Sequence, residues 1–265
     1  MSGVELSVVV PAYNEELALP LTVPLLADRL DELGGRWELI VVDNASEDRT
    51  RERMAELVDG SRIRLLVNDR NRGKGFSVRR GMLEARGALR LHCDADCSGS
   101  LGSLAAMIEL VAGNDLVVGS RLAPGAAVDR RQPLRRRVAG RSFQQLCRLL
   151  LAEPTRDLYC GFKLWRGPVA QDVFSRVSLD GWTFDAEAIA LARALGYRVA
   201  ETGIGWTDRE GSRLSMARVL VPVVRELLAA RAHVRDEAAL GPARGGAPGE
   251  GVAVGAGVPE PDGGR

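Results

Sequence analysis

Short apolar runs alternate with helix-like segments through the first 120 residues of this 265-residue chain, and this alternation constrains the fold most. Each run is short and is bounded by polar or glycine-rich stretches, which is typical of buried strands. The runs that we predict as strands are Val4–Pro11, Trp37–Val42, Ile63–Val67, Leu89–Cys93 and Asp115–Gly119. Strands that alternate with helices predict an α/β fold, a Rossmann-like, mostly parallel sheet with helices on both faces.

Helices are expected between these strands. Those with clear bounds are Ser46–Val58, Phe76–Arg86 and Ser100–Ala112. Asn14 is expected to cap the first helix, whose bounds Pro20 and Pro24 leave open, and Ser46 to cap the second. Ligands of such sheets bind beyond the carboxyl ends of the strands. The polar loops that fall there should converge on one pocket, and they are Tyr13–Glu15, Asp43–Asp48, Asn71–Gly75 and Asp94–Ser98.

The fourth loop carries two carboxylates, Asp94 and Asp96, directly after a strand. Mg²⁺ and Mn²⁺ prefer such oxygen ligands and often share them with substrate phosphates. Turn and helix-cap aspartates remain the alternative for this pair.

The other loops suggest a nucleotide. Asp43 is placed where a carboxylate accepts from ribose hydroxyls or a base edge. Asn71–Gly75 offers two glycines and a lysine before a helix, and such a turn lets backbone N–H groups approach an anion, although a plain turn explains it equally well. The first loop has no GxGxxG pattern, which argues against a dinucleotide site.

The residue composition changes after Arg121. Arginines are interleaved with apolar residues over Arg130–Leu151, and later segments include a helix from about Pro168, a strand over Tyr197–Glu201 and a helix over Arg213–Arg235. Residues 241–265 are rich in Gly, Pro and Ala, so we expect a disordered tail. We therefore expect one domain over residues 1–240, whose two halves meet near residue 120.

Composition excludes some classes. The net charge is +1, which does not suit a nucleic-acid binder. The sequence shows no signal peptide and no apolar run long enough to span a bilayer, so we expect a cytoplasmic protein whose four cysteines are free thiols.

The strand ends and loops together resemble, in chain order, the motifs of family 2 glycosyltransferases. Within that family they are similar to polyprenyl-phosphate (dolichyl-phosphate) glucosyl- and mannosyltransferases. The resemblance covers about Val4–Ser215 and is carried by VVVPAYNEE, VVDNAS, NRGKGFSVRRGMLEARG, DAD, VVGSR, CGFKLWR, FDAE and WTDREGSRLS. Two departures are Asn44, where the family usually has a second acid, and the lack of the membrane spans that eukaryotic relatives often carry.

The resemblance implies an A-type glycosyltransferase fold and an inverting, metal-dependent enzyme. It would move glucose or mannose from UDP or GDP to polyprenyl phosphate. Residues 1–240 would form its single catalytic domain, with a nucleotide-sugar half over about 1–120 and an acceptor half over about 121–240. The implied nucleotide-sugar-binding residues are Pro11, Tyr13, Glu15, Asp43, Lys74, Asp94 and Arg213. The implied ligands of Mg²⁺ or Mn²⁺ are Asp94 and Asp96. Acceptor phosphate is assigned to Arg121, Arg136 and Arg137, and the catalytic residues are Asp96, Asp185 and Arg121.

Two questions remain open at this stage. Asp185 and Glu187 lie where inverting relatives keep a general base, which a hydroxyl acceptor needs and an ionised phosphate does not. The arginine-rich segments are either solvated helix faces or interfacial helices that contact the inner face of a membrane peripherally.

Alternative functions are weighed against this one. The nearest is a nucleotide-sugar glycosyltransferase with a soluble small-molecule acceptor. A haloacid-dehalogenase-type phosphatase carries its D-x-D after the first strand, not the fourth, and a sugar-nucleotide pyrophosphorylase has a different first loop. Asn44 suggests a non-catalytic relative, whereas the intact Asp94 and Asp96 oppose that.

Overall fold

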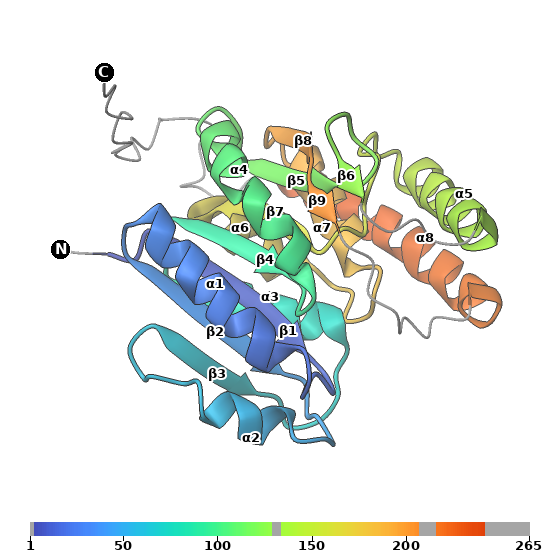
Figure 1. Cartoon of the computed structure of the whole chain (residues 1–265). Coiled ribbons are helices and arrows are strands. Elements are labelled where there is room, and N and C mark those ends of the chain that lie inside the picture. Colours follow the sequence, from blue (N-terminus) through green and yellow to red (C-terminus); the bar gives the residue numbers. More distant parts are fainter. Residues whose placement is uncertain (1–2, 129–133, 207–215, 242–265) are drawn as a thin grey trace.

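The computed structural model describes residues 3–128, 134–206 and 216–241, without the side chains of residues 97–99, 134–139 and 216–222. A seven-stranded sheet forms its centre, in the order β3-β2-β1-β4-β7-β5-β8 (Figure 1). Its strands are β1 Leu6–Ala12, β2 Trp37–Asp43, β3 Ile63–Val67, β4 Leu89–Cys93, β5 Leu116–Ser120, β7 Phe162–Arg166 and β8 Val199–Gly203. A second, two-stranded sheet pairs β6 Ala127–Val128 with β9 Gly205–Trp206.

The predicted α/β class is confirmed. All five strands predicted in the first 120 residues are present, and the strand predicted over Tyr197–Glu201 is β8. β1 pairs in parallel with both β2 and β4. The strands β1, β2 and β3 follow one another towards one edge of the sheet, and the chain then returns to place β4 on the other side of β1. Such a switch point opens a crevice beyond the carboxyl ends of the strands, next to Ala12 and Cys93.

β7 is the strand that the sequence analysis did not predict. It lies antiparallel between β4 and β5, and it separates the two parallel parts of the sheet. Its buried residues are Phe, Lys, Leu and Trp in sequence. The lysine interrupts the apolar run by which a buried strand is recognised in a sequence. The consequence is functional, because the beginning of β7 lies beside the end of β4.

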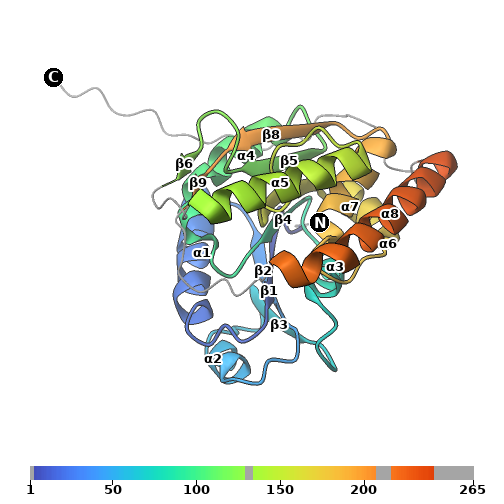
Figure 2. The same ribbon diagram turned by 90° about the vertical axis from the view of Figure 1, so that its right-hand side faces the viewer.

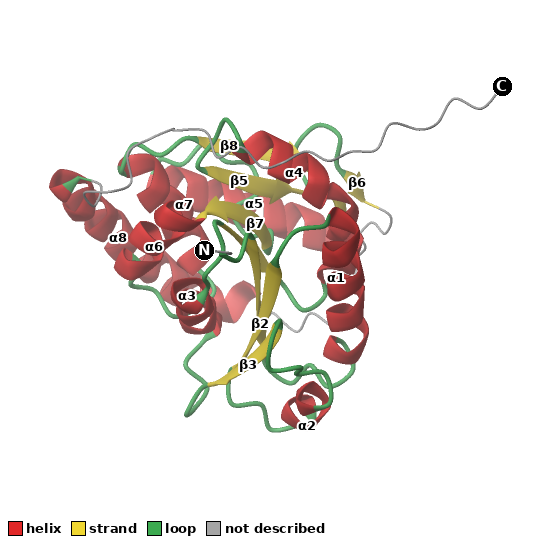
Figure 3. Ribbon diagram, turned by 90° about the vertical axis from the view of Figure 1, so that its left-hand side faces the viewer, coloured by secondary structure: helices red, strands yellow, loops and turns green. Residues whose placement is uncertain are grey.

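Helices cover both faces of the sheet (Figure 3). On one face lie α1 (Leu19–Leu33), α2 (Thr50–Ala55) and α4 (Leu104–Val111), with the 3₁₀ turn Cys97–Ser103 before α4. On the other lie α3 (Lys74–Glu84), α5 (Leu134–Leu151), α6 (Gly167–Arg176), α7 (Phe184–Ala194) and α8 (Met216–Leu240). Alternate residues of β1 serve both cores, since Val9 packs with the α3 side and Val8 and Val10 with the α1 side.

Two helix starts differ from the prediction. α1 begins at Leu19, with Pro20 in its first turn, and α2 begins at Thr50. Asn14 and Ser46 therefore cap neither helix, because both side chains bond to the neighbouring loop instead.

Two of the cysteines are as expected. Cys147 and Cys160 are free thiols, whereas the expectation of a free thiol is wrong for Cys93, which is disulfide-bonded.

α5 and α8 pack against each other at one end of the molecule (Figure 2). In the part of the chain that the structure describes, no helix has the length and apolar character needed to cross a bilayer.

Candidate active site

The loops that follow β1, β2 and β3 are joined by hydrogen bonds at the carboxyl edge of the sheet. The N–H of Asn14 donates to Ser46 Oγ (3.0 Å), and the N–H of Glu47 donates to Asn14 Oδ1 (2.9 Å). Asn44 Nδ2 donates to Asn71 Oδ1 (2.8 Å), which ties in the loop before α3. Three of the four loops that were predicted to converge are therefore joined here.

Asn44 has a structural reason for being an amide. Its Oδ1 accepts from Asn68 Nδ2 (2.9 Å) and from the N–H of Arg72 (3.0 Å), while its own Nδ2 donates to Asn71. A carboxylate has no N–H to donate to Asn71. The amide therefore places the loop of residues 68–72, and it is no sign of a lost activity.

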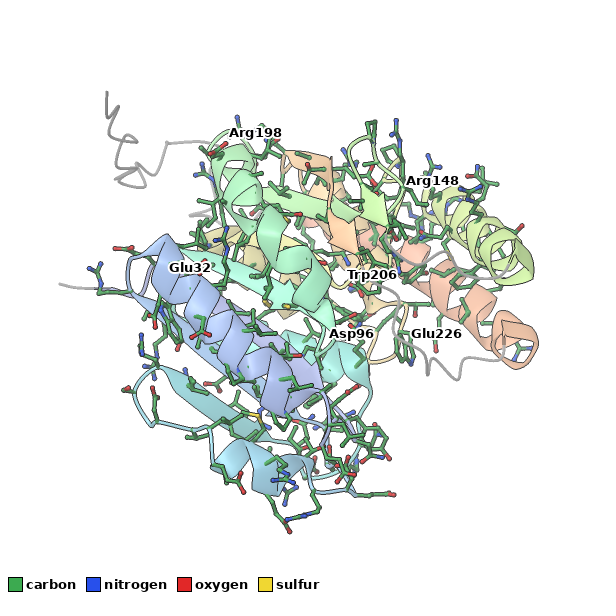
Figure 4. The ribbon with its side chains drawn as sticks, in the orientation of Figure 1. Glu32, Asp96, Arg148, Arg198, Trp206 and Glu226 are labelled. Atoms are coloured by element: carbon green, nitrogen blue, oxygen red, sulfur yellow. The ribbon has the colours of Figure 1, made fainter. Side chains whose placement is uncertain are left out.

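The antiparallel pairing of β4 with β7 assembles the centre of the site. His92 of β4 lies opposite Lys163 of β7, so both side chains are on the same face of the sheet. One step further on, the N–H of Asp94 donates to the carbonyl of Gly161 (2.9 Å). Figure 4 labels Asp96 just beyond the carboxyl end of β4. Residues about 70 positions apart in the sequence thus meet because β7 runs backwards.

Asp185, in the first turn of α7, is buried against these two residues. Lys163 Nζ donates to Asp185 Oδ1 at 2.6 Å and to the carbonyl of Cys160 at 2.6 Å. His92 Nδ1 is 3.5 Å from Asp185 Oδ1. Burial raises the pKa of the Asp185 carboxyl, but Lys163, His92 and Lys74 together outweigh it and hold that pKa below its usual range.

Asp94 carries the second ion pair of the site. Lys74 Nζ lies 2.7 Å from Asp94 Oδ1, and His92 Nε2 lies 3.3 Å from the same oxygen. Burial opposes ionisation of Asp94, yet the Lys74 ammonium and His92 keep its pKa far below the usual value. Conversely, Asp94, Asp185 and Asp96 raise the pKa of Lys74 against the effect of burial. Five groups form a row in which acids and bases alternate with a central histidine: Lys74, Asp94, His92, Asp185 and Lys163.

The donor set of the Asp94 loop fits a hard divalent cation that is shared with a substrate. Asp94 and Asp96 supply carboxylate oxygens, the ligand type that Mg²⁺ and Mn²⁺ prefer. Among the described residues, no group of three or more His, Cys, Asp or Glu side chains is arranged around one metal position. The further ligands would therefore be water and phosphate oxygens, as is usual for Mg²⁺ with a nucleotide.

The glycines at the start of α3, Gly73 and Gly75, serve packing, and the structure shows no anion cradle made by them. A Cβ on Gly73 would lie 2.3 Å from the carbonyl oxygen of Asp180, and one on Gly75 would lie 2.6 Å from that of Leu179. The N–H groups of Gly75 and Phe76 donate to the carbonyls of Gly181 and Asp180. The plain-turn alternative holds for the backbone, and only the Lys74 side chain is left to meet an anion.

Arg121, which follows β5, is fixed by a buried carboxylate. Its Nε and Nη2 donate to Asp157 at 2.7 and 2.8 Å, and Gln144 Nε2 donates to the same carboxylate at 2.7 Å. The guanidinium carbon lies 5.2 Å from the ring centroid of Trp206. Asp157 occupies two of the five N–H groups of Arg121 in a fork geometry, so this arginine is held in one orientation.

The predicted nucleotide-binding residues are in different surroundings. Pro11 is buried in β1, and Tyr13 is exposed just beyond it. The N–H of Glu15 donates to Thr50 Oγ1 (2.7 Å). Asp43 is fully buried at the end of β2, where it accepts from the N–H of Ser46 and from Arg51 Nη2, both at 3.2 Å.

The structure does not describe the side chains of three residues predicted for the site. Arg213 lies outside the described residues. Arg136 and Arg137 lie on α5, whose backbone is described there without the side chains.

Sequence reasoning missed His92, Lys163, Asp157 and Trp182. Trp182, whose ring centroid lies 5.1 Å from Lys74 Nζ, is an exposed aromatic residue beside the site. One signal was available for Lys163, because the chain has only two lysines among 36 Lys and Arg residues. Glu187, weighed as a base, accepts instead from the N–H groups of Ser178 and Leu179 and is structural.

An α/β sheet of this topology, with carboxylates and cations beyond its switch point, places a candidate ligand site where such sheets bind their ligands. Residues 7–174 match the sequence profile of glycosyl transferase family 2, and the chain belongs to this family. It is therefore a glycosyltransferase, as the resemblance implied.

Individual relatives agree with this assignment. The chain is 31% identical over 246 residues to the dolichyl-phosphate beta-glucosyltransferase of Dictyostelium discoideum, over 87% of this chain and 75% of that one. It is 32% identical to the mouse (Mus musculus) enzyme of the same name, over 79% and 69%.

A solved structure confirms the A-type glycosyltransferase fold. Glucosyl-3-phosphoglycerate synthase from Mycobacterium tuberculosis, crystallised with Mn²⁺, UDP and glucosyl-3-phosphoglycerate, superposes with a TM-score of 0.60 at 19% identity. The match covers 88% of this chain and 80% of that one.

Proposed function

We propose that this protein is an inverting, metal-dependent glycosyltransferase that moves a hexose, glucose or mannose, from UDP or GDP to polyprenyl phosphate. The relatives named as dolichyl-phosphate beta-glucosyltransferases support the acceptor and favour glucose. The structural neighbour crystallised with UDP and Mn²⁺ supports UDP and a divalent metal. Residues 1–240 would form one catalytic domain.

The observation that carries the proposal is the Lys163–Asp185 ion pair. A general base must accept a proton in the transition state, and its pKa should lie near the working pH. Lys163 lowers the pKa of the Asp185 carboxyl, which makes Asp185 a poor base. A phosphate monoester needs none, because its second pKa is near 6 and it arrives as an anionic nucleophile.

The reaction is then a direct displacement at C1 of the sugar. An acceptor phosphate oxygen forms the new C1–O bond while the bond between C1 and the nucleoside diphosphate breaks, and no proton needs to move. Negative charge develops on the leaving diphosphate. A divalent cation held by Asp94 and Asp96 would supply charge neutralisation there, and Lys74 lies beside the same carboxylates.

The acceptor anion requires fixed cations on the opposite side of the sugar. Arg121 is preorganised by Asp157 and Trp206, and bidentate arginine suits phosphate. We assign Arg136 and Arg137 of α5 to the same task from the sequence. Tyr13, Glu15, Asp43 and Arg213 remain the proposed contacts to the nucleotide sugar.

A transfer assay tests the proposal. The purified chain is incubated with radiolabelled UDP-glucose, other UDP-hexoses or GDP-mannose, and with a short polyprenyl phosphate, the matching polyprenol or 3-phosphoglycerate. We expect transfer to the polyprenyl phosphate alone, lost with EDTA and restored by Mg²⁺ or Mn²⁺. Asp94→Asn and Asp96→Asn should each abolish transfer. Transfer to 3-phosphoglycerate or to the free polyprenol would instead establish a soluble or hydroxyl acceptor.

A further inference from the structure

The chain uses lysine at two positions only. Lys74 and Lys163 are its only lysines, and every other basic residue among its 36 Lys and Arg residues is arginine. Both lysines lie in the site, where Lys163 pairs with the buried Asp185 and Lys74 pairs with the partly buried Asp94. An ammonium is a compact point charge, whereas a guanidinium forms a rigid bidentate fork. Asp94 and Asp185 are thus each neutralised by a lysine ammonium, which is closer to a metal ion in size and shape than a guanidinium is.

The two ammonium groups differ in how firmly they are held. Lys163 is 1% exposed and donates to both Asp185 and the carbonyl of Cys160. The Lys74 side chain is 15% exposed, pairs with Asp94 Oδ1 and lies beside the exposed ring of Trp182. Lys74 is also the first residue of α3, so its side chain leaves the end of a helix. Lys163 is therefore a fixed counter-ion, and Lys74 has a route towards solvent.

Asp94 itself has little freedom to turn. Its N–H is bonded to Gly161, and a Cβ at Gly161 would lie 2.0 Å from its carboxylate. In addition, Nε2 of His92 lies 3.3 Å from Oδ1 of Asp94. A metal ion held by the Asp94 carboxylate would therefore lie close to the Lys74 ammonium, which pairs with Oδ1 of the same group, and two cations so close together repel each other.

We propose that Lys74 is a built-in cation that neutralises Asp94 in the metal-free protein and leaves it when a divalent cation binds. Lys74 then lies beside the metal, where the diphosphate of the donor becomes its new partner. The inference rests on the proposed metal role of Asp94. It has a consequence for binding: the metal alone has to break an ion pair, whereas metal and nucleoside diphosphate together replace it. Metal and nucleotide should therefore bind cooperatively, and the coupling should be reciprocal.

Removing the competing ammonium tests this. Mn²⁺ is titrated into the full-length protein without nucleotide, and free Mn²⁺ is followed by electron paramagnetic resonance. Lys74→Gln should bind Mn²⁺ alone about tenfold more tightly than the wild type, and UDP should enhance that affinity less than in the wild type, since typical couplings are about 5–150-fold. Arg72→Gln is the matched control, because Arg72 is in the same loop and stacks on Phe76 without pairing with Asp94.

The Arg72→Gln control distinguishes loss of the Lys74–Asp94 ion pair from the loss of any positive charge near the metal site. Arg72→Gln should change Mn²⁺ affinity less than about twofold, since exposed charges are screened by salt. Equal affinity of Lys74→Gln and Arg72→Gln for Mn²⁺ overturns the proposal, and so does weaker binding by Lys74→Gln.

A second measurement needs no variant. Lysine labelled with ¹³C at Cε gives two side-chain signals, from Lys74 and Lys163. Addition of Mg²⁺ should shift the Lys74 signal and leave the Lys163 signal in place. An unmoved Lys74 signal under conditions where Mg²⁺ raises the melting temperature overturns the exchange and leaves the proposed transfer reaction standing. If no metal binds even with UDP, both the exchange and the metal dependence of the proposed function are wrong.

Discussion

At the scale of single residues, the partner of a buried carboxylate decides its chemistry. Asp185, which is buried, and Asp94, which is partly buried, both lie beside His92, yet each pairs with a different lysine. The Lys163 ammonium is almost fully enclosed, so Asp185 is held as a counter-ion. The Lys74 ammonium is partly accessible, so Asp94 remains open to exchange. The same residue type therefore has a positioning role at one end of the row and a metal-binding role, in our proposal, at the other.

Asp185→Asn should destabilise the protein much more than it slows the reaction. Breaking a buried pair leaves the Lys163 ammonium without a charged partner, and we expect the free energy of unfolding to fall by about 3 kcal/mol. We expect the turnover rate with polyprenyl phosphate to fall by less than about tenfold. Denaturant unfolding and initial rates measure the two effects.

The double variant Asp185→Asn with Lys163→Met is the control, and it should recover part of the lost stability because no unpaired ammonium remains. Loss of a general base typically slows turnover by about two to four orders of magnitude. A loss of that size by a folded Asp185→Asn protein would contradict the assignment of Asp185 as a counter-ion.

The residues that pattern reasoning found are those that follow strands directly. Asp43, Asp94 and Asp96 are visible because an apolar run ends just before them. His92 and Lys163 were not visible, because each is a polar residue inside a buried strand and only their antiparallel pairing gives them a role. Asp157 was hidden for a similar reason, since its partner Arg121 is 36 positions away.

At the scale of elements, the junction between β4 and β7 sets the geometry of the site. Gly161 allows the chain to pass directly over the Asp94 carboxylate. Gly161→Ala should displace that carboxylate, because the added Cβ would lie 2.0 Å from its carbon. We expect a loss of Mn²⁺ affinity and of transfer of more than about tenfold, with a smaller effect on stability, since the side chain that must move is short and partly accessible.

Gly113→Ala, which meets nothing within 4 Å, is the matched control and should behave as the wild type. Calorimetric Mn²⁺ titration and the melting temperature measure both variants. Unchanged Mn²⁺ affinity in Gly161→Ala would show that the Asp94 position is not what the metal requires.

The turn before β3 gives a prediction about pH. The N–H of Ile63 donates to Asp59, as do those of Arg62 and Ser61, and together they lower the pKa of Asp59 from 3.8 to about 2. Because the folded-state pKa is depressed, this contribution to stability is present above about pH 4 and is lost as the pH falls towards 2. Asp59→Ala should therefore lower the melting temperature at pH 7 by about 2–4 °C.

The difference between Asp59→Ala and the wild type should shrink between about pH 4 and pH 2, as measured by thermal unfolding at a series of pH values. Asp28→Ala, on the exposed face of α1, is the control and should track the wild type throughout. A constant difference down to the lowest pH would mean that the Asp59 charge does not support the turn.

Sequence patterns predicted which strands and helices are present better than they predicted where the helices begin. The sequence placed six strands of the main sheet, and the apolar signal is strongest in β1, β2 and β5, which are buried along their whole length. The helix starts at Leu19 and Thr50 were missed because Asn14 and Ser46 bond across to each other's loops, and no local rule distinguishes that from capping.

At the scale of the whole molecule, α5 and α8 form an end of the protein that suits a lipid surface. Between them lies a groove of about 410 Å³. It is lined by Leu151, Leu228, Arg231, Ala232, Val234 and Arg235. Leu149 on α5 and Leu228 on α8 are exposed by 67% and 50%. Exposed leucines beside arginines are typical of interfacial helices, and a polyprenyl phosphate acceptor would be presented from such a surface.

We expect the protein to bind vesicles that contain anionic lipid, through the α5–α8 end and in a salt-sensitive way. Each arginine near an anionic surface contributes about 1 kcal/mol, so Arg231→Gln with Arg235→Gln should weaken binding by roughly 30-fold. Sedimentation with vesicles of phosphatidylglycerol and phosphatidylcholine at low and high salt measures this. Arg29→Gln with Arg53→Gln, on α1 and α2 away from α5 and α8 (Figure 1), is the matched control and should leave binding unchanged. Equal losses in the two double variants would point to attraction by net charge and not by this face. Absence of binding at low salt, together with transfer to a water-soluble acceptor, would contradict peripheral membrane contact, since screening is weakest there.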